Sequence, residues 1–166
     1  MAVTIIATVG SASANSYVTL AEAQTILASR TDAADFLAES ADMQRAHLIE
    51  AAEWLERRSW KGTRVDATQR LALPRRYLRK PDDPAGTYFA AGAIPESVKQ
   101  AQCELALGFF EQDDLESVGG DAISSFTAGR VSVQYEQGGG RVSSRYLTRT
   151  SQLLRGLLLA AQVERA

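Results

Sequence analysis

Apolar residues recur at intervals of three and four along much of the chain, and this spacing predicts a mainly helical fold. One helix is expected to begin at Thr19, because Glu22 follows three residues later and completes a capping box. A second helix is expected over about 41–58, where neither glycine nor proline interrupts the pattern. Leu48 and Leu55 lie on one face of that helix, which would therefore pack into the core.

A third helix is expected to begin at Pro95, a residue suited to the first helical position, and to end near Gln112. Over 124–136 apolar and polar residues alternate, which predicts a short β-hairpin. Three glycines at 138–140 predict a hinge, and a leucine-rich helix is expected from Ser144 to the C-terminus. The predicted fold class is mainly α: a small helical bundle with a short β-hairpin and an extended C-terminal helical arm.

The length of 166 residues suits one domain with its own core. We expect a helical domain over 1–137, which contains the hairpin near 124–136, and a hinge with a C-terminal arm over 138–166. The leucines of the arm cover more than one helix face, which predicts burial either against another chain or in a slot of the same chain. The first nine residues lack a basic leader, and a cytoplasmic location is expected.

Charge is strongly segregated along the chain, although the net charge is only -2 and the pI is near 5.5. Residues 57–80 carry nine basic side chains and one acidic side chain. Residues 1–56 carry eight acidic and two basic side chains, and residues 81–118 carry eight acidic and one basic. A dipolar chain of this kind suits either head-to-tail stacking of subunits or the binding of a polyanion.

The basic block at 57–80 is the strongest candidate for a binding surface. Trp60 and Tyr77 lie among its cations, and cations with aromatic rings are the ingredients of sequence-tolerant single-strand binding. A solvated loop whose charges pair with acidic neighbours in the same chain or in an adjacent subunit is the favoured alternative. The candidate DNA-facing or inter-subunit residues are Arg57, Arg58, Lys61, Arg64, Arg75, Arg76, Arg79 and Lys80.

The sequence shows no constellation of catalytic or metal-binding residues. His47 is the only histidine, and no cysteine lies near it to complete a metal site. Cys103 is the only cysteine and lies in a helical pattern, so an inert core thiol is expected. The glycines at 138–140 lack the residues of a phosphate-binding loop. We therefore expect no enzymatic activity, no metal and no cofactor.

Four stretches of the chain stand out by their order and spacing. They are Ala14-Asn15-Ser16-Tyr17-Val18, Ala51-Ala52-Glu53-Trp54-Leu55 with Trp60-Lys61-Gly62, Gln69-Arg70-Leu71-Ala72-Leu73-Pro74-Arg75, and Ile94-Pro95-Glu96-Ser97-Val98-Lys99-Gln100-Ala101 running into Glu104-Leu105-Ala106. Together these stretches, which span most of the chain, resemble the phage head-to-tail adaptor proteins, a family whose members are often labelled DnaT-like single-stranded-DNA-binding proteins.

This resemblance implies a homo-oligomeric ring, a dodecamer in the virion, that lies between the portal protein and a stopper or tail-side connector protein. Genomic double-stranded DNA would pass through its lumen. The protein would reside in the host cytoplasm before assembly and in the virion neck afterwards. The arm would dock on the portal, and we infer that its contacts include Arg145, Tyr146, Leu147, Arg149, Leu153, Leu154, Leu157 and Leu158.

The chain departs from the family pattern at Leu73, where a tryptophan is frequent, and over 77–92, where the insertion is longer than expected. The function of this loop is therefore open. The alternative function belongs to another class, a single-stranded-DNA-binding module that acts as a replication accessory. The acidic overall charge fits that alternative less well, although one basic stripe could suffice.

Overall fold

The structure is a computed structural model that describes residues 2–111, 125–128, 131–134 and 145–159. The described part is mainly helical with short antiparallel hairpins, which confirms the predicted fold class in its main features. None of its helices is long and apolar enough to cross a membrane. The helices are α1 (Leu20–Leu27), η1 (Thr31–Ala33, a 3₁₀ turn), α2 (Ala34–Ala38), α3 (Ala41–Glu56), α4 (Glu96–Phe110) and α5 (Arg145–Leu153). The strands are β1 (Thr63–Arg64), β2 (Arg75–Arg76), β3 (Ser125–Ala128) and β4 (Val131–Gln134).

The predicted capping box at the start of α1 is present. The Thr19 hydroxyl accepts a hydrogen bond from the Glu22 amide at 3.2 Å, and the Glu22 carboxylate accepts one from the Thr19 amide at 2.8 Å. A side-chain cap also begins α3, where the Ser40 hydroxyl accepts from the Met43 amide at 3.3 Å. Both caps satisfy amides that the first helical turn leaves without a partner.

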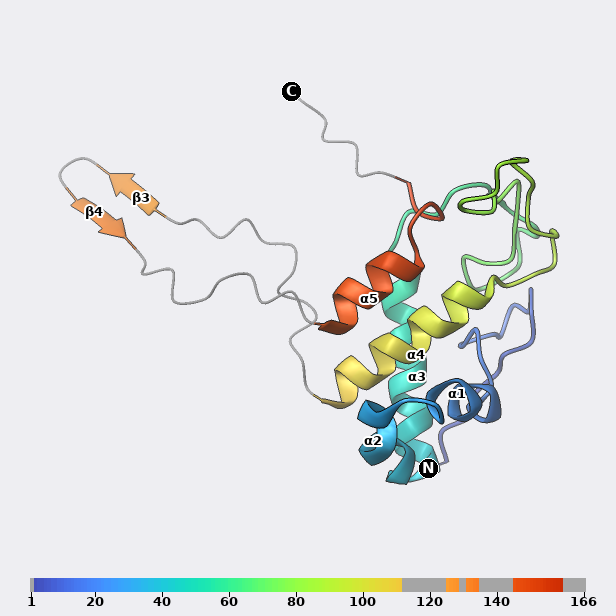
Figure 1. The fold of residues 1–166 in the computed structure, drawn as a ribbon, viewed down its shortest axis with the longest axis horizontal. Coiled ribbons are helices and arrows are strands. Elements are labelled where there is room, and N and C mark those ends of the chain that lie inside the picture. The colour runs from blue at the N-terminus through green and yellow to red at the C-terminus, as the bar shows by residue number, and fades with distance from the viewer. Residues whose placement is uncertain (1, 112–124, 129–130, 135–144, 160–166) are drawn as a thin grey trace.

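The core lies where α4 packs between α3 and α5 (Figure 1). Leu48 and Leu55 of α3 and Leu105 of α4 are fully buried there. Gln102 of α4 is buried among them and fully bonded: its side-chain oxygen accepts from the Tyr17 amide at 3.0 Å, and its amide group donates to the Leu48 carbonyl at 2.7 Å. This one side chain therefore joins the N-terminal segment, α3 and α4.

The C-terminal helix is shorter than predicted, because α5 ends at Leu153 and the chain turns at Gly156, which has a φ of 83°. Such a conformation breaks a helix and favours glycine. The residues that follow α5, 154–159, are called the C-terminal strap here. The strap runs antiparallel to residues 59–61, where the Lys61 amide donates to the Leu157 carbonyl at 3.0 Å.

Over residues 145–159 the expected arm is part of the folded core of its own chain. Tyr146, Leu147, Leu154 and Leu157 are buried, and they cover apolar surface of α4 and residues near Trp60. The physical reason is that a leucine-rich segment buries its side chains against the nearest apolar surface that it can reach. The glycines at 138–140 and residues 160–166 lie outside the described residues.

The hairpin predicted near 124–136 is present as β3 and β4, which pair antiparallel with Phe126 opposite Val133. A second, shorter hairpin was not predicted. In it, Thr63 of β1 lies opposite Arg76 of β2, and Arg64 lies opposite Arg75. The sequence did not reveal this hairpin because two residues per strand are too few for a recognisable alternation of apolar and polar side chains.

Candidate nucleic-acid interface

Arg75 of the basic block holds the fold of its own loop. Its guanidinium donates to the carbonyls of Lys61 and Gly62, both at 2.7 Å, and to that of Ala72 at 3.3 Å. These bonds connect residues on both sides of the β1–β2 hairpin. The hydrogen-bonding groups of Arg75 are directed into the chain that carries it, so in this structure they are engaged within the loop and not by DNA or a neighbouring subunit.

Three further cations of the block contact their own chain. The Lys61 ammonium donates to the Gly156 carbonyl of the C-terminal strap at 2.9 Å. The Arg58 guanidinium lies 3.6 Å from the centre of the Trp54 ring, at the end of α3. Arg64 donates to the Gln69 carbonyl at 3.4 Å. Arg58 and Arg64 still expose surface, whereas Lys61 is partly buried.

Arg76, Arg79 and Lys80 are exposed, and none of them forms an ion pair within the part of the chain that the structure describes. Arg57 is exposed as well. The cations that follow β2 are therefore those most available to an external anion. The basic block thus divides into a structural part and a solvent-facing part, a division that its composition did not predict.

Residues 77–80 and 87–89 form a short antiparallel ribbon, called the tyrosine ribbon below. Arg79 pairs with Tyr88, and the Lys80 amide donates to the Thr87 carbonyl at 2.9 Å. Side chains alternate between the two faces of such a ribbon. Leu78 is buried on the inner face, so Tyr77, Arg79 and Tyr88 share the outer face.

The two tyrosines of the outer face are the most exposed aromatic side chains in the described residues. Tyr77 is 70% exposed and Tyr88 is 56% exposed. Their ring centroids are 6.2 Å apart and their planes are inclined by 86°, an edge-to-face contact. Two exposed aromatic rings in contact form a small apolar patch, which makes this face a candidate binding surface.

Two glycines permit this geometry. A Cβ at Gly62 would lie 2.3 Å from the Arg76 carbonyl oxygen, so only glycine allows the backbone next to Tyr77 to approach β1 closely. A Cβ at Gly86 would lie 2.6 Å from a guanidinium nitrogen of Arg79, which shows that the Arg79 side chain lies over this turn. Tyr77 itself has a φ of 59°, an uncommon value for a bulky residue, which is consistent with a functional constraint.

Trp60, the aromatic residue that the sequence suggested beside Tyr77, is not part of the exposed surface. It is 4% exposed, and its indole nitrogen donates to the Leu55 carbonyl at 3.1 Å. Tyr88 takes its place as the second exposed ring, and sequence reasoning missed it. The available signal was the alternation around Tyr77 and Leu78, followed by a turn and a second aromatic pair at Tyr88.

The residues predicted to bind the portal lie at the contact between α5 and the rest of the chain. Four of the eight are the buried side chains of α5 and the strap described above, and Leu153 and Leu158 are partly buried. Arg145 pairs with Glu111 at 2.8 Å, and Arg149 pairs with Asp32 at 3.0 Å. In this conformation only the two arginines offer substantial surface to a partner.

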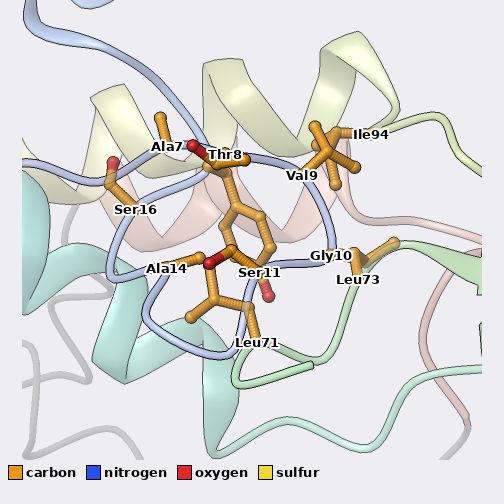
Figure 2. A pocket seen from close by; sticks show the side chains of 11 residues that line it. Ala7, Thr8, Val9, Gly10, Ser11, Ala14, Ser16, Leu71, Leu73 and Ile94 are labelled. Atoms are coloured by element: carbon orange, nitrogen blue, oxygen red, sulfur yellow. The ribbon is translucent and has the colours of Figure 1, made fainter. Parts of the chain in front are cut away.

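The structure contains a small cavity beside Tyr17. Figure 2 shows this cavity between the N-terminal segment and the loop that carries Leu71 and Leu73, with Val9 and Ile94 at one side. Its volume is about 10 Å³, which is close to the minimum for a single water molecule. Among the described residues, no three histidine, cysteine, aspartate or glutamate side chains are placed to hold a metal ion.

Comparison with known proteins adds one finding. The chain matches, over residues 1–166, the model of a family described as "Putative DnaT-like ssDNA binding protein". No match was found among curated proteins or solved structures. Because the match extends over the whole chain, the protein belongs to this DnaT-like family.

Proposed function

We propose that the protein is a non-enzymatic single-stranded-DNA-binding module, a replication accessory, and that it holds the strand on the tyrosine ribbon. The observation that carries the proposal is the exposed pair of Tyr77 and Tyr88, with Arg79 on the same face. The name of the family supports the same class of ligand.

The chemistry of the ribbon suits a single strand better than a duplex. Stacking of a base on an aromatic side chain contributes about 1–3 kcal/mol and is tolerant of sequence. In a duplex the base faces are already stacked on one another, so Tyr77 and Tyr88 would find no free base. Arg76, Arg79 and Lys80 are exposed beside the rings and can neutralise phosphates.

Fluorescence anisotropy with labelled oligothymidine tests this function. We expect the single strand to bind more tightly than a duplex of equal length, and the affinity to fall as the salt concentration rises. Replacing both Tyr77 and Tyr88 with alanine should remove most of the binding. Met43→Ala is the matched control, because Met43 is exposed on α3 away from the ribbon. Equal binding of single and double strands by the wild-type protein would contradict the proposal.

A second candidate function is a head-to-tail adaptor of a tailed phage, located in the virion neck. The observation that favours it is the segregation of charge along the chain: residues 1–56 carry eight acidic and two basic side chains, whereas residues 57–80 carry nine basic and one acidic. Segments of opposite net charge suit a repeated contact between subunits in a ring.

In this second function the partners would be a portal protein, a stopper or tail-side connector, and the DNA in the lumen. Electron microscopy of the protein with and without purified portal rings would test it. The adaptor function requires a ring of added density on the portal. If portals stay bare while oligothymidine binds to the tyrosine ribbon, the adaptor function is excluded in favour of the first proposal.

A further inference from the structure

A hollow of about 270 Å³ opens beside the tyrosine ribbon. Three cations line it: Lys61, Arg79 and Lys80. Gly156 of the C-terminal strap also lines it, and its carbonyl accepts the hydrogen bond from the Lys61 ammonium. The hollow is therefore built from three separate segments of the chain, and Arg79 belongs both to it and to the outer face of the ribbon.

Two carboxylates also line the hollow, and they differ in their availability. Asp83 accepts hydrogen bonds from the Ala85 amide at 2.9 Å, from the Thr87 amide at 3.0 Å and from the Thr87 hydroxyl. These bonds, the Thr87 hydroxyl first, lower the pKa of Asp83 and engage its carboxylate in its own turn. Asp82 is exposed and forms no ion pair within the described residues.

We propose that this hollow is a phosphate subsite, which takes one phosphodiester of a single strand whose base stacks on Tyr88. The inference rests on the proposed function and deepens it. Three cations against two carboxylates leave one net positive charge, which one phosphodiester neutralises. Arg79 connects the hollow with the aromatic face of the ribbon, because it lines the hollow and pairs with Tyr88 across the ribbon.

Asp82 restrains the affinity of this subsite. Its carboxylate repels a phosphate that enters the hollow, while Asp83 is held by its own turn. Asp82 has a φ of 58°, a conformation that asparagine adopts as readily as aspartate. Asp82→Asn therefore removes the charge and preserves the backbone, which makes a gain of affinity the most specific signature of the subsite.

The test measures oligothymidine affinity as a function of salt concentration for two pairs of variants and one single variant. Lys80→Gln should lower the slope of log K against log salt by about 0.7, the value for one phosphate contact on a single strand. Its control, Arg70→Gln, removes an exposed cation that does not line the hollow and should leave the slope nearly unchanged. Lys61 is left intact because its ammonium holds the C-terminal strap.

Asp82→Asn should raise the affinity about two- to five-fold at low salt, the effect of removing one like charge a few ångströms away in water. Asp35→Asn on α2 removes a charge that is also exposed but lies outside the hollow, and it should have a smaller effect. Tyr77→Ala completes the set, because it weakens stacking without changing the charge of the hollow.

The outcomes separate the subsite from the proposed function. If Tyr77→Ala weakens binding while Lys80→Gln and Asp82→Asn behave as their controls do, the proposed phosphate subsite is wrong and single-strand binding on the tyrosine ribbon is supported. If the wild-type protein binds no oligonucleotide, the subsite and the proposed function are both wrong. Titration with inorganic phosphate at constant ionic strength distinguishes a free anion from a strand: saturable phosphate binding that Lys80→Gln abolishes, with an unchanged oligothymidine slope, would overturn the assignment to a phosphodiester.

Discussion

The ring of Tyr77 contacts the ring of Tyr88 edge to face, with centroids 6.2 Å apart, on opposite strands of a ribbon that exposes both. Each ring limits the motion of the other, so a base that stacks on one meets a surface that is already ordered. The two side chains should therefore act as one unit in binding.

This relationship predicts coupled effects of mutation. Tyr77→Ala and Tyr88→Ala should each weaken oligothymidine binding by about 1–3 kcal/mol, and the double variant by less than the sum. The phenylalanine variants should retain most of the affinity, because stacking uses the ring and not the hydroxyl. Anisotropy titrations of the wild-type protein, the two single alanine variants and the double alanine variant give the coupling free energy between the two rings. Strict additivity would show that the rings bind independently.

The burial of the C-terminal strap predicts a stability difference between two leucines that are two residues apart. Leu157 is fully buried and Leu159 is 55% exposed. Leu157→Ala should lower the free energy of unfolding by about 2–5 kcal/mol, because it leaves a cavity in the core. Leu159→Ala should change it by at most about 0.5 kcal/mol. Urea unfolding followed by circular dichroism measures both values, and equal losses would show that the strap does not pack in solution as it does here.

Removing residues 145–166 should have a larger effect than either point variant. The deletion exposes the face of α4 that Tyr146 and Leu154 cover. We expect a chain that aggregates or unfolds, whereas a free arm could be removed without loss of the fold. A truncated protein with an unchanged thermal midpoint in scanning calorimetry would restore the arm hypothesis.

The capping carboxylate of α1 predicts a loss of stability in acid. The Lys99 ammonium, followed by the Thr19 amide and hydroxyl, lowers the pKa of Glu22 from 4.5 to about 2. Because the folded-state pKa lies below the unfolded one, this stabilisation is present above pH 4.5 and is lost as the pH falls toward 2. Glu22 is 44% exposed, so solvent screening keeps the effect small.

Glu22→Gln should therefore weaken the dependence of the unfolding free energy on pH between 4.5 and 2. Glu53→Gln serves as its control, because Glu53 is exposed and forms no ion pair among the described residues. Urea titrations at several pH values compare the two variants. Identical pH profiles for Glu22→Gln and the wild-type protein would contradict the role of this carboxylate.

Cys103 should be unreactive in the folded protein. It is 1% exposed within α4, and burial raises the pKa of its thiol to about 12. At pH 8 the thiol is therefore both protonated and inaccessible. Ellman's reagent should detect no thiol in the native protein and one equivalent after denaturation in guanidinium chloride. Rapid reaction of the native protein would show that α4 opens readily.

The sequence predicted the elements that depend on local interactions. The capping box of Thr19 and Glu22, the apolar faces of α3 and α4, and the alternation in β3 and β4 involve residues a few positions apart. Such patterns act within a single element, so they can be recognised without the rest of the fold. The prediction of a buried, inert Cys103 is of the same kind, since its burial follows from its place in a helical repeat.

The exact ends of elements and the roles of the charged residues were less predictable. The helix expected to reach the C-terminus stops at Leu153, and the hairpin of β1 and β2 was not foreseen. Arg75 and Arg79 are identical in type and only four positions apart, yet one holds a loop and the other faces solvent. Nothing local distinguishes them.

The sequence by itself determined where α1, α3 and α4 lie, where β3 and β4 pair and that cations gather in residues 57–80. Only the tertiary structure decided which of these side chains are free to bind. Trp60 is buried because the C-terminal strap, nearly a hundred residues away along the chain, covers it, whereas Tyr77 and Tyr88 are exposed because a ribbon turns them outward. Exposure depends on contacts between distant segments, and such contacts exist only once the chain has folded.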